Sequence, residues 1–68
     1  MTIRDFLEVT YDNCMIIVEV GIEKNNTYWT ETIYRGPAYG LATREELIDR
    51  KIVNVHPQAF TVNKILIK

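Results

Sequence analysis

The sequence has few of the residues that catalytic and metal sites commonly use. Its 68 residues include one cysteine and one histidine. One cysteine excludes an internal disulfide, and a single Cys and a single His leave too few soft ligands for a zinc site within one chain. We therefore expect neither a metal nor a cofactor. The lack of a cysteine pair also favours a reducing compartment, so the expected location is the cytoplasm.

Long apolar runs and a strong charge of one sign are also missing. No stretch approaches the roughly 18 uninterrupted apolar residues of a membrane helix, and Arg4, Asp5 and Glu8 interrupt the N-terminal segment where a signal peptide would have its apolar region. We expect no contact with a membrane. The chain is 47% hydrophobic with a net charge of −1, whereas a disordered chain would have fewer apolar residues and more net charge. The composition predicts one small globular domain over residues 1–68.

Periodicity in the first half predicts one helix followed by a hairpin. An apolar stripe at i, i+3 and i+4 from Ile3 indicates a helix that Thr2 caps and that ends near Thr10. From Cys14 to Ile22 the apolar residues alternate, and many are β-branched, which is typical of a strand. A second segment rich in Thr, Tyr and Ile, Thr27–Arg35, predicts the returning strand.

The length of the hairpin turn decides which side chains share a face. A two-residue turn at Asn25-Asn26 sets Ile22 opposite Trp29 and Val18 opposite Ile33. A three-residue turn would set apolar residues against threonines instead. Because the first register keeps apolar residues together, we favour it.

The middle of the chain predicts a loop and a second helix. Two glycines and a proline within Arg35–Gly40 indicate a loop. Thr43 and Glu46 have the spacing of a capping box, so we expect a short helix over about Arg44–Arg50.

Two more strands complete the predicted fold. They are Ile52–His56 and Thr61–Ile67, joined by a turn in which Pro57 takes the second position. The element order α-β-β-α-β-β predicts an α+β domain. We expect a mostly antiparallel four-stranded sheet with two short helices on one face.

No group of residues indicates catalysis. His56 lacks a partner nucleophile or carboxylate in the sequence. Cys14 begins the most apolar strand, where a thiol behaves as a small hydrophobic group. The segment Gly36–Gly40 is neither a Walker loop nor a dinucleotide fingerprint. We therefore expect a protein that is not an enzyme, with no catalytic, cofactor-binding or metal-binding residue.

The outward face of the first hairpin is the candidate partner-binding surface. In the favoured register, two neighbouring strands place eight side chains on it: Met15, Ile17, Glu19, Glu23, Tyr28, Thr30, Thr32 and Tyr34. Methionine and aromatic side chains with a polar rim are typical of protein interfaces. The alternative is that a helix or another chain covers this face as core. The glutamates of the hairpin would steer it to a basic partner, and the small core favours a homodimer through the same hairpin.

Charge is distributed unevenly along the chain and allows a second hypothesis. Residues 1–34 carry two basic and six acidic side chains, and residues 35–68 carry six basic and three acidic. The alternative function is a nucleic-acid-binding accessory or regulatory protein that uses this basic half. Direct binding would normally need a strongly basic face or a recognised motif. The basic residues are instead scattered: Arg35, Arg44, Arg50, Lys51, Lys64 and Lys68.

The two ends of the chain carry a resemblance. With its opening Met-Thr-Ile-Arg-Asp-Phe-Leu-Glu and closing Thr-Val-Asn-Lys-Ile-Leu-Ile-Lys, the chain resembles small uncharacterised proteins of bacteriophages and mobile elements of Gram-positive bacteria. Some proteins of this kind are anti-CRISPR or other anti-defence inhibitors that act by stoichiometric binding. The resemblance implies a phage-type inhibitor of a host defence protein, whose partner is a host or phage protein.

Overall fold

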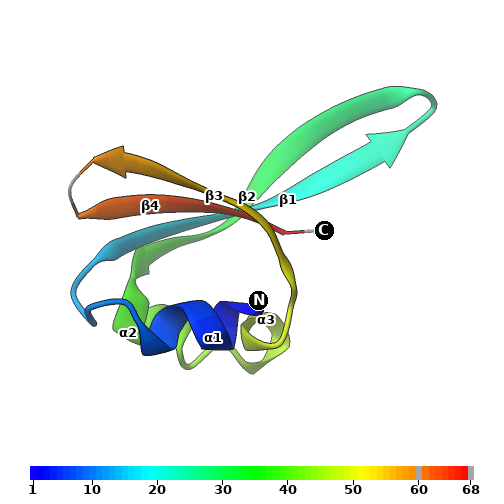
Figure 1. Ribbon diagram of the computed structural model, residues 1–68. Coiled ribbons are helices and arrows are strands. Elements are labelled where there is room, and N and C mark those ends of the chain that lie inside the picture. Colours follow the sequence, from blue (N-terminus) through cyan, green and yellow to red (C-terminus); the bar gives the residue numbers. More distant parts are fainter. Residues whose placement is uncertain (60, 68) are drawn as a thin grey trace.

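The computed structural model describes residues 1–59 and 61–67, in which a four-stranded sheet lies above a layer of short helices (Figure 1). The α+β class expected from the sequence is confirmed. The elements in chain order are α1 (Ile3–Glu8), β1 (Met15–Lys24), β2 (Thr27–Pro37), α2 (Ala38–Leu41), α3 (Glu45–Ile48), β3 (Ile52–Ala59) and β4 (Val62–Ile67). None of these helices has the length and apolarity needed to cross a bilayer.

The strand order is β2-β1-β4-β3, so the expected four-stranded sheet is present, and its mostly antiparallel pairing holds for two of the three strand pairs. Both hairpins are antiparallel, but the central pair, β1 with β4, is parallel. The central strands carry the fully buried Ile16, Val18, Ile65 and Ile67, so the two most apolar strands meet in the middle. Hairpin turns fix the direction only within each hairpin, and the burial of these side chains decides how the hairpins join.

The first hairpin has the expected two-residue turn. Asn25 and Asn26 have φ of 52° and 64°, the left-handed values that a type I′ turn requires. Lys24 faces Thr27 across the turn, and Ile22 faces Trp29 as predicted. Figure 1 shows this hairpin extending beyond the helix layer as an arm.

A β-bulge changes the second part of the hairpin. The register shifts between Val18 and Glu19, so Val18 faces Tyr34 and the prediction that it faces Ile33 is wrong. The extra residue turns Tyr34 onto the inner face, where it is only 9% exposed. Its hydroxyl donates a hydrogen bond to the Pro37 carbonyl oxygen at 2.7 Å.

Glycines make room for the Tyr34 side chain. A Cβ at Gly36 would lie 2.8 Å from the Tyr34 hydroxyl oxygen, and one at Gly40 would lie 2.5 Å from it. The Arg44 guanidinium stands 5.4 Å from the centre of the ring, at the distance of a cation–π contact. The two glycines therefore pack around a core side chain, and the loop predicted over Arg35–Gly40 is instead the end of β2 followed by α2.

The core lies between the sheet and the helices. Its buried members come from β1, β2, β4 and all three helices: Ile3, Ile16, Val18, Tyr34, Ala38, Leu41, Leu47, Ile65 and Ile67. Phe6, Leu7 and Cys14 are partly buried against it. The apolar stripe of the first predicted helix thus packs inward as expected.

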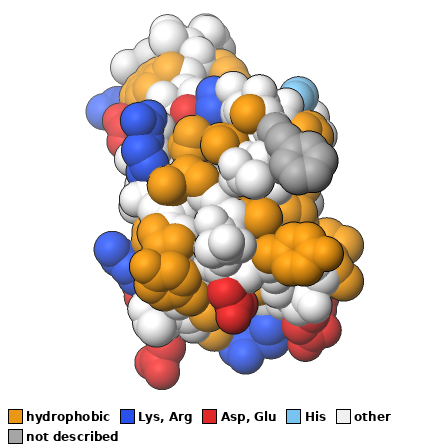
Figure 2. All heavy atoms as spheres, turned by 90° about the vertical axis from the view of Figure 1, so that its left-hand side faces the viewer, with side chains coloured by type: hydrophobic (Ala, Val, Ile, Leu, Met, Phe, Trp, Pro, Cys, Tyr) orange, Lys and Arg blue, Asp and Glu red, His pale blue; other side chains and the backbone are white. Residues whose placement is uncertain are grey.

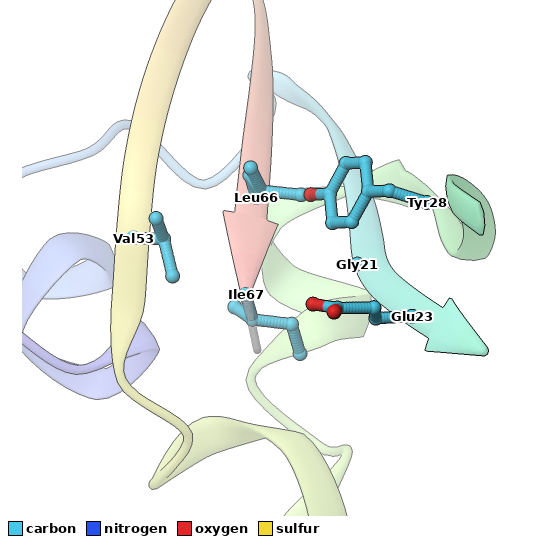
Figure 3. A pocket seen from close by; sticks show the side chains of 6 residues that line it. All are labelled: Gly21, Glu23, Tyr28, Val53, Leu66 and Ile67. Atoms are coloured by element: carbon cyan, nitrogen blue, oxygen red, sulfur yellow. The ribbon is translucent and has the colours of Figure 1, made fainter. Parts of the chain in front are cut away.

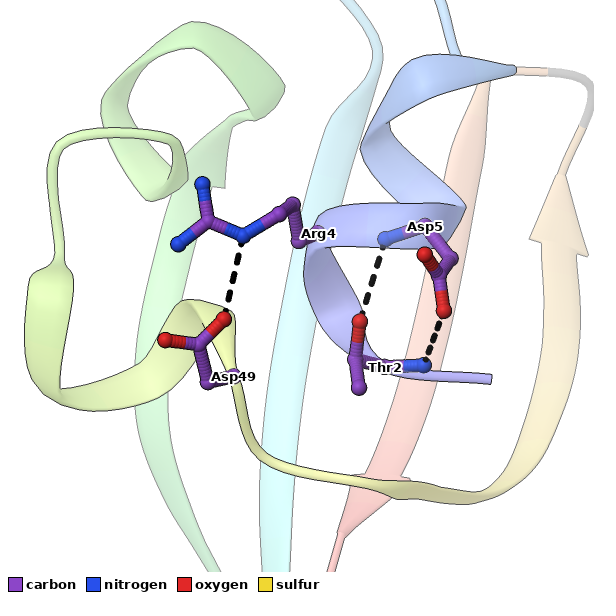
Figure 4. A network of polar contacts seen from close by, with 4 residues as sticks. All are labelled: Thr2, Arg4, Asp5 and Asp49. Carbon is purple, nitrogen blue, oxygen red and sulfur yellow. Dashed lines mark hydrogen bonds and ion pairs between the residues drawn. The ribbon is translucent and has the colours of Figure 1, made fainter.

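Helix α1 starts at a complete capping box (Figure 4). The Asp5 N–H donates to the Thr2 hydroxyl at 3.2 Å, and the Thr2 N–H donates to the Asp5 carboxylate at 2.9 Å. The Thr2 backbone N–H, and after it the Thr2 side chain, holds the pKa of the Asp5 carboxyl group below its usual value. The Arg4 Nε lies 3.0 Å from an Asp49 carboxylate oxygen and links α1 to the end of α3.

The capping box expected at Thr43 does not form. The Thr43 hydroxyl donates to the Gly40 carbonyl oxygen at 2.7 Å and so closes α2. The cap of α3 is Arg44, without a side-chain hydrogen bond, and α3 ends at Ile48. Only Ala42 separates Thr43 from α2, so the Gly40 carbonyl oxygen lies within reach of the Thr43 hydroxyl.

The turn expected at Pro57 is also wrong. Strand β3 continues through Pro57 to Ala59, and Pro57 faces Asn63 of β4. Because β3 is an outer strand, a residue without an N–H is tolerated in it. Phe60, which the predicted turn included, lies outside the described residues.

Candidate partner-binding surface

All described helices lie on one side of the sheet, and the other face carries most of the predicted surface (Figure 1). The alternation of β1 and β2 about the buried Ile16 and Val18 places seven of the eight predicted residues on this outward face: Met15, Ile17, Glu19, Glu23, Tyr28, Thr30 and Thr32. Within the described chain no helix covers them, so the alternative in which a helix of this chain buries the face is excluded for those residues.

Tyr34 is the member that does not belong to this surface. It lies in the core on the other side of the sheet, so the predicted apolar cluster of Met15, Ile17 and Tyr34 is wrong. Met15 remains exposed and Ile17 half-buried. The outward face is consequently less apolar at this end than the sequence predicts.

Glu19 is held by neighbours on the same face. The Lys64 Nζ of β4 lies 3.5 Å from one Glu19 carboxylate oxygen, and the Thr32 hydroxyl donates to the other at 3.2 Å. The Glu19 side chain is only 17% exposed. A carboxylate with a cation and a hydroxyl beside it contributes little to long-range steering, so this role of Glu19 is not supported by its surroundings.

A hollow of about 340 Å³ lies in the outward face where β4 ends (Figure 3). Residues of β1, β2, β3 and β4 line it: Gly21, Glu23, Tyr28, Val53, Leu66 and Ile67. Figure 3 shows the Tyr28 ring crossing β1 beside Gly21 with its hydroxyl toward Leu66. The Glu23 carboxylate points into the same space from a position two residues beyond Gly21 on β1.

Gly21 explains why the ring lies flat on β1. A Cβ at this position would be 2.5 Å from the Tyr28 hydroxyl oxygen and 3.1 Å from the ring. Tyr28 faces Glu23 and is thus a diagonal neighbour of Gly21, within reach of an aromatic side chain. Sequence reasoning did not single out Gly21, Val53 or Leu66. A glycine inside an apolar strand was the available signal, because it marks a close approach of another group.

Glu31 lies on the opposite side of the arm from Glu23. It faces Val20 from the outer strand of the sheet, and its carboxylate accepts a hydrogen bond from the Trp29 indole N–H at 3.3 Å. The hairpin glutamates expected to attract a basic partner are Glu19, Glu23 and Glu31. Of these, Glu23 alone lines the hollow.

Three further exposed apolar side chains lie where α1 ends and α2 begins. Val9, Tyr11 and Tyr39 are 79%, 81% and 62% exposed. Figure 2, which looks onto this end of the molecule, shows hydrophobic side chains in several groups separated by polar atoms and backbone. This dispersed arrangement differs from the lined hollow of the outward face.

The basic side chains of the second half do not form one face. Lys64 pairs with Glu19 on the sheet, and Arg44 lies against Tyr34 with its guanidinium 3.7 Å from Glu46. Arg35 is exposed on β2, whereas Lys51 follows α3. Lys68 lies outside the described residues.

The single histidine and cysteine lie apart. The Nε2 atom of His56 is 2.9 Å from the Asn54 side-chain nitrogen on the exposed β3, and Cys14 packs half-buried against the core. Among the described residues, no three His, Cys, Asp or Glu side chains gather in a way that would hold a metal ion.

Comparisons of the chain with protein-family models, with curated proteins and with solved structures found no match.

Proposed function

We propose that this protein is a small non-enzymatic module that binds another protein through the outward face of the β1–β2 hairpin. The observation that carries the proposal is the hollow lined by Tyr28, Leu66 and Glu23 on a face that no described helix covers. An aromatic side chain beside an apolar pocket is typical of binding hot spots.

The lining of the hollow indicates the chemistry of the partner. Its walls are apolar except for the Glu23 carboxylate and the Tyr28 hydroxyl. A lysine or arginine fits such a site, because its aliphatic stem packs on apolar surface while its charged end meets a carboxylate and an aromatic ring. We therefore expect the partner to present a basic residue within an apolar surround.

The resemblance of the chain ends to phage proteins supports a narrower form of this proposal. In that form the protein is a stoichiometric inhibitor of a host defence protein, similar to anti-CRISPR proteins, and acts in the cytoplasm. Binding through one face suits an inhibitor, since it needs contact area and no catalytic group.

Affinity capture from a host lysate tests the proposal when the wild type and two variants are compared. Tyr28→Ala removes the aromatic wall and is expected to weaken capture by about 30-fold, the equivalent of a hot spot of about 2 kcal/mol. Tyr11→Ala is the matched control, because Tyr11 is also exposed but lies away from the sheet. Retention of every partner by folded Tyr28→Ala protein, or loss with Tyr11→Ala alone, would contradict the proposal.

A charge variant and salt separate this function from nucleic-acid binding. Glu23→Gln is expected to weaken the protein complex, whereas Glu45→Gln on α3 leaves it unchanged. A nucleic-acid complex would respond in the opposite way, because removal of a negative charge favours contact with phosphate. It would also lose affinity steeply and linearly in the logarithm of salt concentration.

A further inference from the structure

The sheet has two free edges, and they differ in how well they are protected. Strand β3 carries Pro57 and two register irregularities over eight residues. Proline and bulges are devices that prevent another strand from pairing with an edge. Strand β2, in contrast, has seven consecutive exposed residues, Thr27–Ile33, none of them proline or glycine, and its register with β1 is regular from Thr27 to Thr32.

The turn geometry determines which backbone groups of β2 are free. In the Asn25-Asn26 turn the Thr27 N–H bonds to the Lys24 carbonyl, so Thr27 points its backbone groups at β1. Backbone direction alternates along a strand, and the next residues with groups facing the open edge are Tyr28, Thr30 and Thr32. Each offers one N–H and one C=O to a further strand.

The sequence of this edge is complementary to itself when two copies run antiparallel. With Thr30 opposite the Thr30 of a second copy, Tyr28 meets Thr32 and Trp29 meets Glu31, in both directions. The Trp29 indole already donates to the Glu31 carboxylate within one chain at 3.3 Å, so their chemistry is matched. Threonine opposite threonine is a favourable cross-strand pair.

The two neighbouring registers of this pairing are less favourable than the one centred on Thr30. A shift of one step toward the bulge sets Glu31 opposite Glu31, and like charges directly opposite are destabilising. A shift toward the turn brings Asn25 and Asn26, which have positive φ, into the pairing. The register centred on Thr30 uses the whole exposed run, from Thr27 beside the turn to Ile33, the extra residue of the bulge.

We infer that the free edge of β2 is a dimer interface, in which two copies of this chain pair antiparallel about Thr30 to form one eight-stranded sheet. The arm extends beyond the helices, so its edge is accessible (Figure 1). On the inner face of the two paired arms, partly exposed apolar side chains of both copies come together, among them Trp29 and Ile33. Because each chain has one unprotected edge, a two-fold pairing closes and does not continue into a fibre. The inference is independent of the proposed function, since the pairing uses backbone groups and leaves the hollow open.

Hydrogen exchange of the wild-type chain tests this pairing. The amides of Tyr28, Thr30 and Thr32 face water in a monomer and bond the partner strand in the dimer, so their protection should rise with protein concentration. The amides of Trp29 and Glu31 bond β1 in both states and provide the internal control. The inference would be overturned if the exchange rates of the first three amides did not depend on protein concentration and sedimentation gave a monomeric mass at about 1 mM. That concentration is a sensitive limit, because a dimer with a Kd of 1 mM has a binding free energy of only about −4 kcal/mol.

Cysteine cross-linking fixes the register, in a Cys14→Ser background that removes the native thiol. Thr30→Cys should form a disulfide-linked dimer by itself, and Tyr28→Cys should link to Thr32→Cys when the two proteins are mixed. Tyr28→Cys by itself should not form a disulfide-linked dimer. In this register the two copies of residue 28 lie four residues apart along the strands, about 13 Å, which is beyond the reach of a disulfide. Equal self-linking of Tyr28→Cys would contradict the register.

A proline variant gives a second route to the same conclusion. Thr30→Pro removes an outward N–H without breaking a bond to β1, and we expect it to raise the Kd of the dimer by about tenfold or more, comparable to one lost hydrogen bond. Thr30→Val retains the N–H and should dimerise normally. A folded Thr30→Pro protein that dimerises as tightly as the wild type would overturn the inference.

Discussion

Removal of one oxygen atom from Tyr34 is the most informative test of the fold, because the bulge determines where this side chain lies. In Tyr34→Phe the hydrogen bond to the Pro37 carbonyl, 2.7 Å long and partly buried, is lost. The carbonyl oxygen is left without that donor, and the space between Gly36 and Gly40 that the hydroxyl occupies is only partly filled. We expect a loss of about 1–2 kcal/mol in the free energy of unfolding. The midpoint of thermal unfolding should fall by about 4–8 °C for each kcal/mol in a domain of this size.

Tyr28→Phe is the matched control for this measurement. Tyr28 is 61% exposed on the outward face, so removal of its hydroxyl should change stability by less than about 0.5 kcal/mol. Urea denaturation followed by circular dichroism gives both values. If β2 lacked the bulge, Tyr34 would lie on the outward face and both substitutions would have similar small effects. Equal stability of the two variants would therefore refute the placement of Tyr34 in the core.

Four further changes test other parts of the structure. Thr2→Ala removes the cap of α1 and should cost about 1 kcal/mol in urea denaturation; no measurable loss would contradict the capping box. The pKa of Asp5 is lowered in the folded state, so its contribution is present above its ordinary value of 3.8 and is lost as the pH falls through the folded pKa. The stability advantage of wild type over Asp5→Asn should accordingly shrink on acidification, and an advantage that grows would have the wrong sign. Asn26→Gly should raise the thermal midpoint, because glycine tolerates the φ of 64° at this turn, and a lower midpoint would argue against a type I′ turn. Ile65→Ala should cost about 2–5 kcal/mol, since Ile65 is fully buried, whereas Val53→Ala on the exposed β3 should cost far less; similar losses would contradict the assigned core.

Local signals in the sequence predicted the first helix and hairpin. The Thr2 cap, the alternation after Cys14 and the Asn25-Asn26 turn each depend on residues close together in the chain, and all three are present. The bulge was not predictable in the same way. Thr32, Ile33 and Tyr34 are all acceptable on either face of a strand, so alternation alone does not show where an extra residue enters.

The errors in the second half have a common physical origin. Glycine and proline indicate loops in isolation, but Gly36 and Gly40 admit the Tyr34 side chain, and Pro57 sits in an outer strand. Both depend on what packs nearby. The parallel pairing of β1 with β4 likewise results from long-range burial, which no short pattern encodes.

The candidate surface was predicted in large part, because alternation about the β1 core residues places the outward side chains correctly. The hollow was not, since it requires β1, β2, β3 and β4 to be assembled around Gly21. Its Leu66 wall comes from a strand 45 positions further along the chain.

An NMR titration of the labelled chain with a purified partner tests whether a protein binds the outward face of the hairpin. We expect the signals of Thr30, Thr32 and Leu66 to shift on binding, while those of Val9 and Tyr39, at the far end of the molecule, stay in place. Shifts confined to Val9 and Tyr39 would contradict it.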